Sequence, residues 1–202
     1  MILWAAALAF GAARIPPVDQ CRGESSFDSF RSGLARIVER RDSKALLAVL
    51  SDQVMVDFEN SSGPREFARV WKLTGNHARQ SPVWRELALV MRLGCARADR
   101  ARVMPSLVIQ LSDQDALEKF LALPRAQLRQ APTENARVVA RLNFHVVTRQ
   151  ESSAPNGWWR VALSNGRSGY LRESEIRTAL QYRAQFEKIG PRWRLVSFVE
   201  GD

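Results

Sequence analysis

Lysine, histidine, cysteine and long apolar runs are all scarce in this sequence of 202 residues. The two histidines and two cysteines lack the ligand spacing of a zinc site, so we expect no metal and no cofactor. No apolar run reaches the ~18–20 residues that cross a bilayer, which argues against an integral membrane span. Hydrophobic residues at 46 % and charged residues at 25 % are ordinary for globular proteins, so we expect a folded chain of one domain or two small ones.

The net charge of +9 is carried almost entirely by arginine. The four lysines are Lys44, Lys72, Lys119 and Lys188. Basic residues are scattered through every segment rather than clustered with stacking aromatics, which disfavours nucleic acid as the partner. A basic exported protein would instead be attracted to the anionic cell envelope.

The first residues are typical of an export signal. Residues 2–13 are apolar and mostly small, and Arg14 and two prolines follow closely. Cleavage after Ala13 would place Gly11 and Ala13 at the two small-residue positions before the cut. We therefore predict a signal peptide over residues 1–13 and a periplasmic or exported location. A buried helix is the alternative for this segment.

Cys21 and Cys95 are predicted to form a disulfide. An oxidising compartment allows the two cysteines to form a disulfide. In the chain-entropy model a disulfide that closes a long loop stabilises the fold by about 3–4.5 kcal/mol. The alternative is two unrelated thiols, one of them a nucleophile. Catalysis by Cys95 would need a neighbouring base, and nothing in the spacing places His77 or His145 beside it. Lipidation of Cys21 is not expected, because the preceding Asp19-Gln20 is not small.

Residues 24–123 are predicted to form a helix-rich α+β domain. Apolar side chains at three- and four-residue steps indicate helices between residues 27 and 93. We interpret the aromatic residues of these stripes as core. Beyond them we expect a strand over residues 103–111 and a short helix over residues 115–123, capped by Ser112 or Asp113.

From residue 124 onward the pattern becomes that of short strands. Residues 138–142 and 144–147 form two such runs. Asn156-Gly157 and Asn165-Gly166 are typical hairpin turns, and they flank a third run over residues 158–163. Several short strands at regular spacing with glycine turns argue for a small barrel.

The same region carries a family resemblance. Its pattern runs through Ala126-x-Leu128-Arg129, Pro132, Ala136-Arg-Val138-Val139-x-x-Leu142, Gly157-Trp158-Trp159-Arg160-Val161 and Asn165-Gly166-Arg-x-Gly169-Tyr170-Leu171. This pattern resembles bacterial SH3 domains over residues 124–178, although Asn143-Phe144 stands where the family has a glycine. The resemblance implies a non-catalytic binding module of exported proteins that act at the cell wall.

Strand alternation divides this module into two faces. The face predicted to be the core carries Trp159, Val161 and Leu163. The other face carries Trp158 and Arg160, and an outward-facing Trp158 beside Arg160, joined by Tyr170, would suit a cell-wall peptide or glycan. The alternative is that Trp158 packs against the N-terminal helices.

Residues 179–202 are predicted to form a β-hairpin around Gly190-Pro191. With the SH3-like stretch, Tyr182-Arg-Ala-x-Phe186-Glu-Lys and the terminal Phe198-Val-x-Gly-Asp resemble an uncharacterised group of exported proteobacterial SH3-domain proteins. The helical start and closing hairpin also resemble, at fold level, the cone-shaped domain of nuclear transport factor 2, in which case the hairpin would complete the N-terminal domain. The predicted fold class is α+β: a mainly helical N-terminal domain, a small SH3-like β-barrel and a C-terminal β-hairpin.

The sequence contains no motif of a known reaction. It has no glycine-rich phosphate loop and no Gly-x-Ser-x-Gly elbow. Glu173 and Glu175 are interpreted as partners of nearby arginines, and Asp113 and Asp115 as helix caps. We therefore predict a non-enzymatic binding or scaffold protein, whose partner is a cell-wall peptide or glycan or an envelope protein. The alternatives are an accessory of cell-wall hydrolysis with a closed, polar-lined small-molecule pocket in the N-terminal domain, and a nucleic-acid-binding protein.

Overall fold

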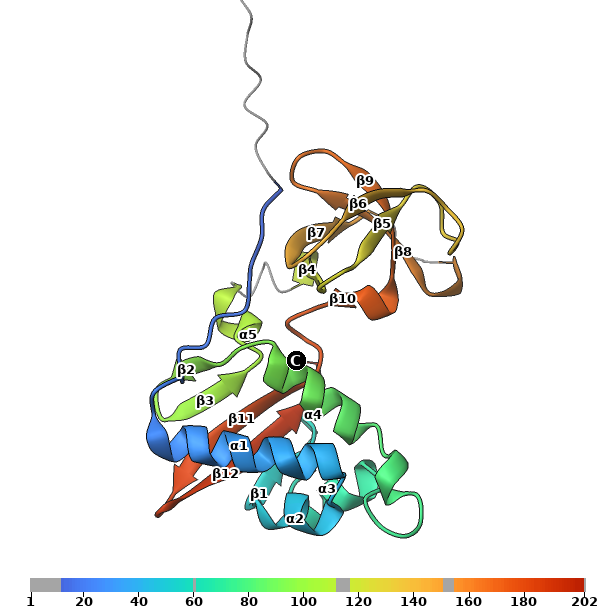
Figure 1. Cartoon of the computed structure of the whole chain (residues 1–202). Coiled ribbons are helices and arrows are strands. Elements are labelled where there is room, and N and C mark those ends of the chain that lie inside the picture. Colours follow the sequence, from blue (N-terminus) through green and yellow to red (C-terminus); the bar gives the residue numbers. More distant parts are fainter. Residues whose placement is uncertain (1–11, 60, 112–116, 151–154, 202) are drawn as a thin grey trace, which may run out of the picture. The chain divides into compact units, whose positions relative to one another are not determined.

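The computed structural model describes residues 12–59, 61–111, 117–150 and 155–201 (Figure 1). The chain divides into two compact units. We call residues 17–117 and 179–202 the main unit, and residues 12–16 and 118–178 the inserted unit. Within the described ranges, no helix has the length and apolar character needed to cross a membrane.

The main unit is a five-stranded sheet with α1 and α4 across one face (Figure 1). The strand order is β1-β12-β11-β3-β2; β1 is parallel to β12 and all other neighbours are antiparallel. Its helices are α1 (Ser25–Arg40), α2 (Ser43–Ala48), α3 (Pro64–Val70), the 3-10 turn η1 (Ala78–Gln80), α4 (Val83–Arg92) and α5 (Leu107–Gln110). Its strands are β1 (Leu50–Met55), β2 (Ala96–Ala98), β3 (Ala101–Met104), β11 (Arg183–Ile189) and β12 (Arg192–Val199).

The helices form where apolar residues recur at the helical period, as the sequence predicts. Helix α1 ends at Arg41, which adopts a left-handed φ of 54°. Asp42 begins the next helix, because its carboxylate accepts a hydrogen bond from the Ala45 N–H at 2.9 Å. The buried stripes are Phe27, Leu34 and Val38 in α1, and Val83, Trp84, Leu87 and Val90 in α4.

Aromatic side chains fill the space between these helices and the sheet. The ring centroid of Phe27 lies 4.8 Å from that of Trp193 and 5.8 Å from that of Phe186, and all three side chains are buried. Contacts of this kind are stabilising beyond the area that they bury. At this place the domain therefore has an apolar core rather than the closed, polar-lined pocket that the hydrolysis-accessory alternative predicts.

The inserted unit is a seven-stranded antiparallel sheet in the order β10-β4-β7-β8-β9-β5-β6. Residues 12–15 run beside β7: the Val146 N–H donates to the Ala13 carbonyl, and the Ile15 N–H donates to the Phe144 carbonyl, both at 2.8 Å. The strands are β4 (Lys119–Ala122), β5 (Gln127–Arg129), β6 (Val138–Arg141), β7 (His145–Arg149), β8 (Trp158–Leu163), β9 (Ser168–Arg172) and β10 (Ile176–Arg177), with 3-10 turns η2 (Pro155–Gly157) and η3 (Glu173–Glu175).

The predicted fold class is wrong. The chain is mostly β, with one sheet of five strands and one of seven, rather than a helical domain followed by an SH3-like barrel and a hairpin. The N-terminal part supplies β1, β2 and β3 to the five-stranded sheet, and β12 lies between β1 and β11 in it. Strands of three and four residues, such as β2 and β3, are too short for alternation to reveal, so the longer helical stripes dominated the prediction.

Two local predictions are also corrected. Residues 119–122 form strand β4 rather than part of a helix, because they pair with residues of β7. Ser112, Asp113 and Asp115 lie outside the described residues. The strand expected over residues 103–111 ends at Met104, where Pro105 has no N–H for a ladder bond. The signal peptide stays a prediction, since residues 1–11 also lie outside the described ranges.

Candidate functional site

Strand alternation places a row of polar side chains on the outer face of the inserted unit's sheet. Tyr170 of β9 is the register partner of Arg160 in β8 and of Arg129 in β5, so the three side chains lie side by side across adjacent strands. Arg160 is exposed and Tyr170 is half-buried. We call Arg129, Tyr170 and Arg160 the Arg-Tyr row.

The opposite face forms the core of this unit. Val161 and Leu163 of β8 are buried there, as predicted. The residues that pack with them are Ala122, Ala126, Leu128, Leu142, Val147, Leu171 and Ile176. Because this face is closed by apolar packing, the outer face is the side of β8 and β9 that can meet a ligand.

Trp158 does not present its ring to solvent. It shares the outer face with Arg160, yet only 2 % of its surface is exposed. The guanidinium of its register partner Arg172 lies over the indole, 4.4 Å from the ring centroid. Trp158 is therefore not the outward-facing anchor that was expected. It lies on the predicted face of β8, but the guanidinium of Arg172 lies over its ring.

Glu134 connects Arg129 of the Arg-Tyr row with Arg172. Its carboxylate accepts a hydrogen bond from Arg172 Nε at 2.6 Å and lies 3.7 Å from Arg129 Nη2. Arg129 also donates to the Gln127 side-chain oxygen at 2.7 Å and to the Ala136 carbonyl at 3.0 Å. These contacts hold Arg129 and Arg172 in place, and of the two arginines in the row Arg160 is the exposed one.

Trp159, which the sequence predicts to be a core residue, makes a second contact between an aromatic ring and an arginine. Its ring lies 5.2 Å from Phe120 in an edge-to-face contact, and the guanidinium of Arg149 lies 3.9 Å from its centroid. Trp159 is half-buried rather than fully buried. Two adjacent tryptophans in a strand place one aromatic ring on each face of the sheet. The arginines that lie over these rings come from other strands, so the local pattern does not identify them.

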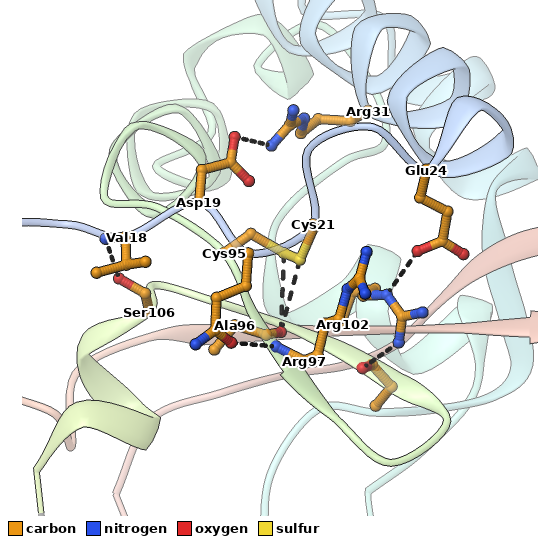
Figure 2. Close-up of a disulfide and its surroundings, with 12 residues drawn as sticks. Val18, Asp19, Cys21, Glu24, Arg31, Cys95, Ala96, Arg97, Arg102 and Ser106 are labelled. Carbon is orange, nitrogen blue, oxygen red and sulfur yellow. Dashed lines mark hydrogen bonds and ion pairs between the residues drawn. A yellow bond between two sulfur atoms is a disulfide. The ribbon is translucent and has the colours of Figure 1, made fainter.

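Cys21 and Cys95 form the predicted disulfide (Figure 2). Both are fully buried, and the bridge fastens the segment before α1 to the start of β2. Backbone bonds lie beside it: the Cys95 N–H donates to the Val18 carbonyl at 2.9 Å and the Gln20 N–H donates to the Cys95 carbonyl at 2.8 Å. Because its sulfur is bonded and buried, Cys95 is not a nucleophile in this state.

Asp19 lies close to the two sulfur atoms, but this group is not suited to a metal. Metals bind cysteine as the thiolate, and both sulfurs are in the disulfide. The Asp19 carboxylate instead pairs with Arg31 at 2.7 Å, as Figure 2 shows.

The remaining titratable candidates have local structural roles. Glu175 accepts backbone N–H bonds from Gln127 and Arg172, each at 3.0 Å, rather than acting only as a solvated partner of arginine side chains. His145 Nδ1 accepts the Asn143 N–H at 2.9 Å. Burial, together with the nearby charge of Arg14, lowers the pKa of His145.

No protein-family model matches the sequence. A stretch of 77 residues, 37 % of the chain, is 29 % identical to the probable endopeptidase p60 of Listeria grayi. The match spans only 15 % of that protein's length. A solved structure, the protein named Rd1NTF2_05 with several substitutions, aligns over 88 % of this chain and 98 % of its own. Its identity is 10 % and its TM-score 0.31, which does not indicate a shared fold.

Proposed function

We propose that this chain is an exported, non-catalytic protein of the bacterial cell envelope, and that its inserted unit binds a wall peptide or glycan, or an envelope protein. The observation that carries the proposal is the Arg-Tyr row, in which Tyr170 lies between two arginines on the outer face of the sheet. Tyrosine and arginine are the residue types that most often dominate binding energy at interfaces.

Three further observations support an envelope role. The partial match to the probable endopeptidase p60 supports a cell-wall-related role. The buried Cys21–Cys95 disulfide is compatible with an oxidising compartment outside the cytoplasm. The net charge of +9 would add a long-range attraction to an anionic wall.

The row suits a ligand with carboxylate or carbonyl oxygens. Guanidinium groups bind such oxygens in a fork geometry, and a tyrosine between them offers both a ring surface and a hydroxyl. In this proposal Trp158 packs against the guanidinium of Arg172 and stabilises the sheet, whereas Arg160 and Tyr170 contact the ligand. No side chain of the row is assigned an acid, base or nucleophile role.

Co-sedimentation with purified cell-wall sacculi tests the proposal. The wild type is expected to pellet with sacculi, and Arg160→Ala and Tyr170→Ala are each expected to weaken binding about tenfold. Arg167→Ala is the matched control, because Arg167 is an exposed arginine of the same unit in the β8–β9 turn. Failure of the wild type to bind sacculi would contradict the wall ligand.

The Arg167→Ala control also distinguishes general electrostatic attraction from binding at the Arg-Tyr row. Equal loss of binding in Arg167→Ala and Arg160→Ala would show that general basicity, not the row, retains the protein. Steep salt-dependent binding to DNA with no binding to sacculi would instead support the nucleic-acid alternative.

A further inference from the structure

The main unit carries a cleft on the sheet face opposite α1 and α4. Its volume is about 1170 Å³, which slightly exceeds the roughly 300–1,000 Å³ of most small-molecule sites. The floor is one register row across three adjacent strands: Val103 of β3, Gln185 of β11 and Ser197 of β12. The neighbouring strand residue Phe186 belongs to the core on the helical side and does not line the cleft, so the sheet separates the cleft from that core.

The walls of the cleft expose large apolar side chains. Met55 at the end of β1 is 41 % exposed, Phe58 in the following loop 46 % and Ile109 of α5 51 %. Such residues converge here from three separate elements. Apolar walls above a sheet floor form a surface that water solvates poorly and that an apolar group can cover.

The floor offers neutral hydrogen-bonding groups. Gln185 Nε2 donates to the Glu187 carboxylate at 3.0 Å, which fixes the orientation of the amide and leaves its oxygen as an acceptor. The Ser197 hydroxyl lies next to it in the register row and can both donate and accept. The polar groups therefore lie on the floor, below the apolar walls.

The charged residues that line the cleft are balanced. Asp99 and Glu187 carry negative charge, and Arg100 and Arg183 carry positive charge. Arg183 is held in the wall, because it lies over the Phe58 ring at 5.2 Å and its Nη2 donates to the Gly201 carbonyl at 2.7 Å. A charged ligand would meet a like charge as well as an opposite one, so this balance favours an uncharged ligand.

We infer that this cleft binds a small uncharged amphiphile, with an aliphatic or aromatic body against Met55, Phe58 and Ile109 and an amide or hydroxyl group on Gln185 and Ser197. This site lies in the main unit and is independent of the Arg-Tyr row. A ligand of this kind covers the exposed apolar walls and forms hydrogen bonds with Gln185 and Ser197 on the floor, without introducing charge.

Three probes with the same heptyl chain test the inference: octanamide, octanoate and heptylammonium, each titrated into the full ¹⁵N-labelled chain below the aggregation concentration of the probe. Octanamide is expected to shift the amide resonances of Val103, Gln185 and Ser197, with an affinity about tenfold higher than that of either charged probe. Absence of these shifts overturns the site. Equal affinity for all three probes overturns the inferred ligand class.

Two isoleucine variants locate the binding. Ile109→Asp is expected to weaken octanamide binding about tenfold. Ile189→Asp is the control, because Ile189 is 49 % exposed in the same unit but does not line the cleft. Equal effects of the two variants would overturn the location. Ser197→Ala, which removes one hydroxyl from the floor, is expected to weaken octanamide binding while leaving the spectrum of the free protein otherwise unchanged.

Discussion

The guanidinium of Arg172 covers the indole of Trp158, with 4.4 Å between the guanidinium carbon and the ring centroid. The two residues are cross-strand partners in β8 and β9, and Trp158 is only 2 % exposed. An aromatic residue held in this way contributes to the stability of the sheet, whereas its neighbour Arg160 remains on the exposed surface.

Trp158→Ala is therefore expected to destabilise the inserted unit by about 3–5 kcal/mol, the usual cost of truncating a buried large aromatic. Arg160→Ala is expected to change stability by less than about 0.5 kcal/mol, because it alters an exposed side chain. Urea unfolding followed by tryptophan fluorescence measures both. Equal stability of the two variants would contradict the structural role assigned to Trp158.

Removing the disulfide is expected to destabilise the main unit. The bridge spans a sequence separation of 74 residues, for which the chain-entropy model gives about 4 kcal/mol. The double variant Cys21→Ser, Cys95→Ser should unfold at a lower urea concentration than the wild type. Adding reductant to the wild type should reproduce this shift, and adding it to the double variant should have no effect.

Deletion of residues 179–202 is expected to prevent the main unit from folding. Strand β12 lies between β1 and β11, and its residues Leu195 and Phe198 are fully buried in the core. Deletion of residue 202 alone is the control. Amide dispersion in NMR spectra distinguishes the outcomes, and a truncated chain with native dispersion in residues 17–117 would show that β11 and β12 are dispensable.

Acid is expected to destabilise the inserted unit through His145. Burial and the charge of Arg14 hold the pKa of this imidazole below its ordinary value of 6.5. The unfolded chain then binds the proton more readily than the folded chain, so the stability contribution is complete above pH 6.5 and is lost as the pH falls below it. His145→Gln should weaken this pH dependence in urea unfolding between about pH 5 and pH 7.5. An increase in the stability of the wild type as the pH falls over this range would contradict the prediction.

Alkali is expected to act on the main unit through Tyr182. Burial, followed by a hydrogen bond to the Glu200 carboxylate, raises the pKa of this phenol above its ordinary value of 10.0. Its contribution to stability is present below pH 10.0 and is lost as the pH rises beyond that value. The wild type and Tyr182→Phe should show the same phenolate absorbance up to about pH 11 while the protein stays folded. A phenolate signal missing from the variant within that range would contradict the raised pKa.

The sequence predicts those features that depend on neighbouring residues along the chain. The stripe of Phe27, Leu34 and Val38 is helical and buried, and Val161 and Leu163 face the core. The disulfide was also predictable, because only two cysteines are present.

The remaining features depend on pairing between distant segments. Leu50 pairs with Leu195 and Lys119 with Thr148, and neither partner can be identified from local periodicity. The same reason accounts for the error at Trp158, since alternation assigns a side chain to a face but does not show that Arg172 covers it. The cleft of the main unit likewise needs Val103, Gln185 and Ser197 to meet across three strands.

The order of strands in the main unit has a consequence for synthesis. The inserted unit, residues 118–178, is complete in the growing chain before β11 and β12 have been made. Strand β1 therefore cannot pair with its neighbour β12 until residues 192–199 have been added. During that interval the apolar sides of α1 and α4 lack the two central strands of their sheet, so the nascent chain presents its greatest aggregation risk before β11 and β12 are made.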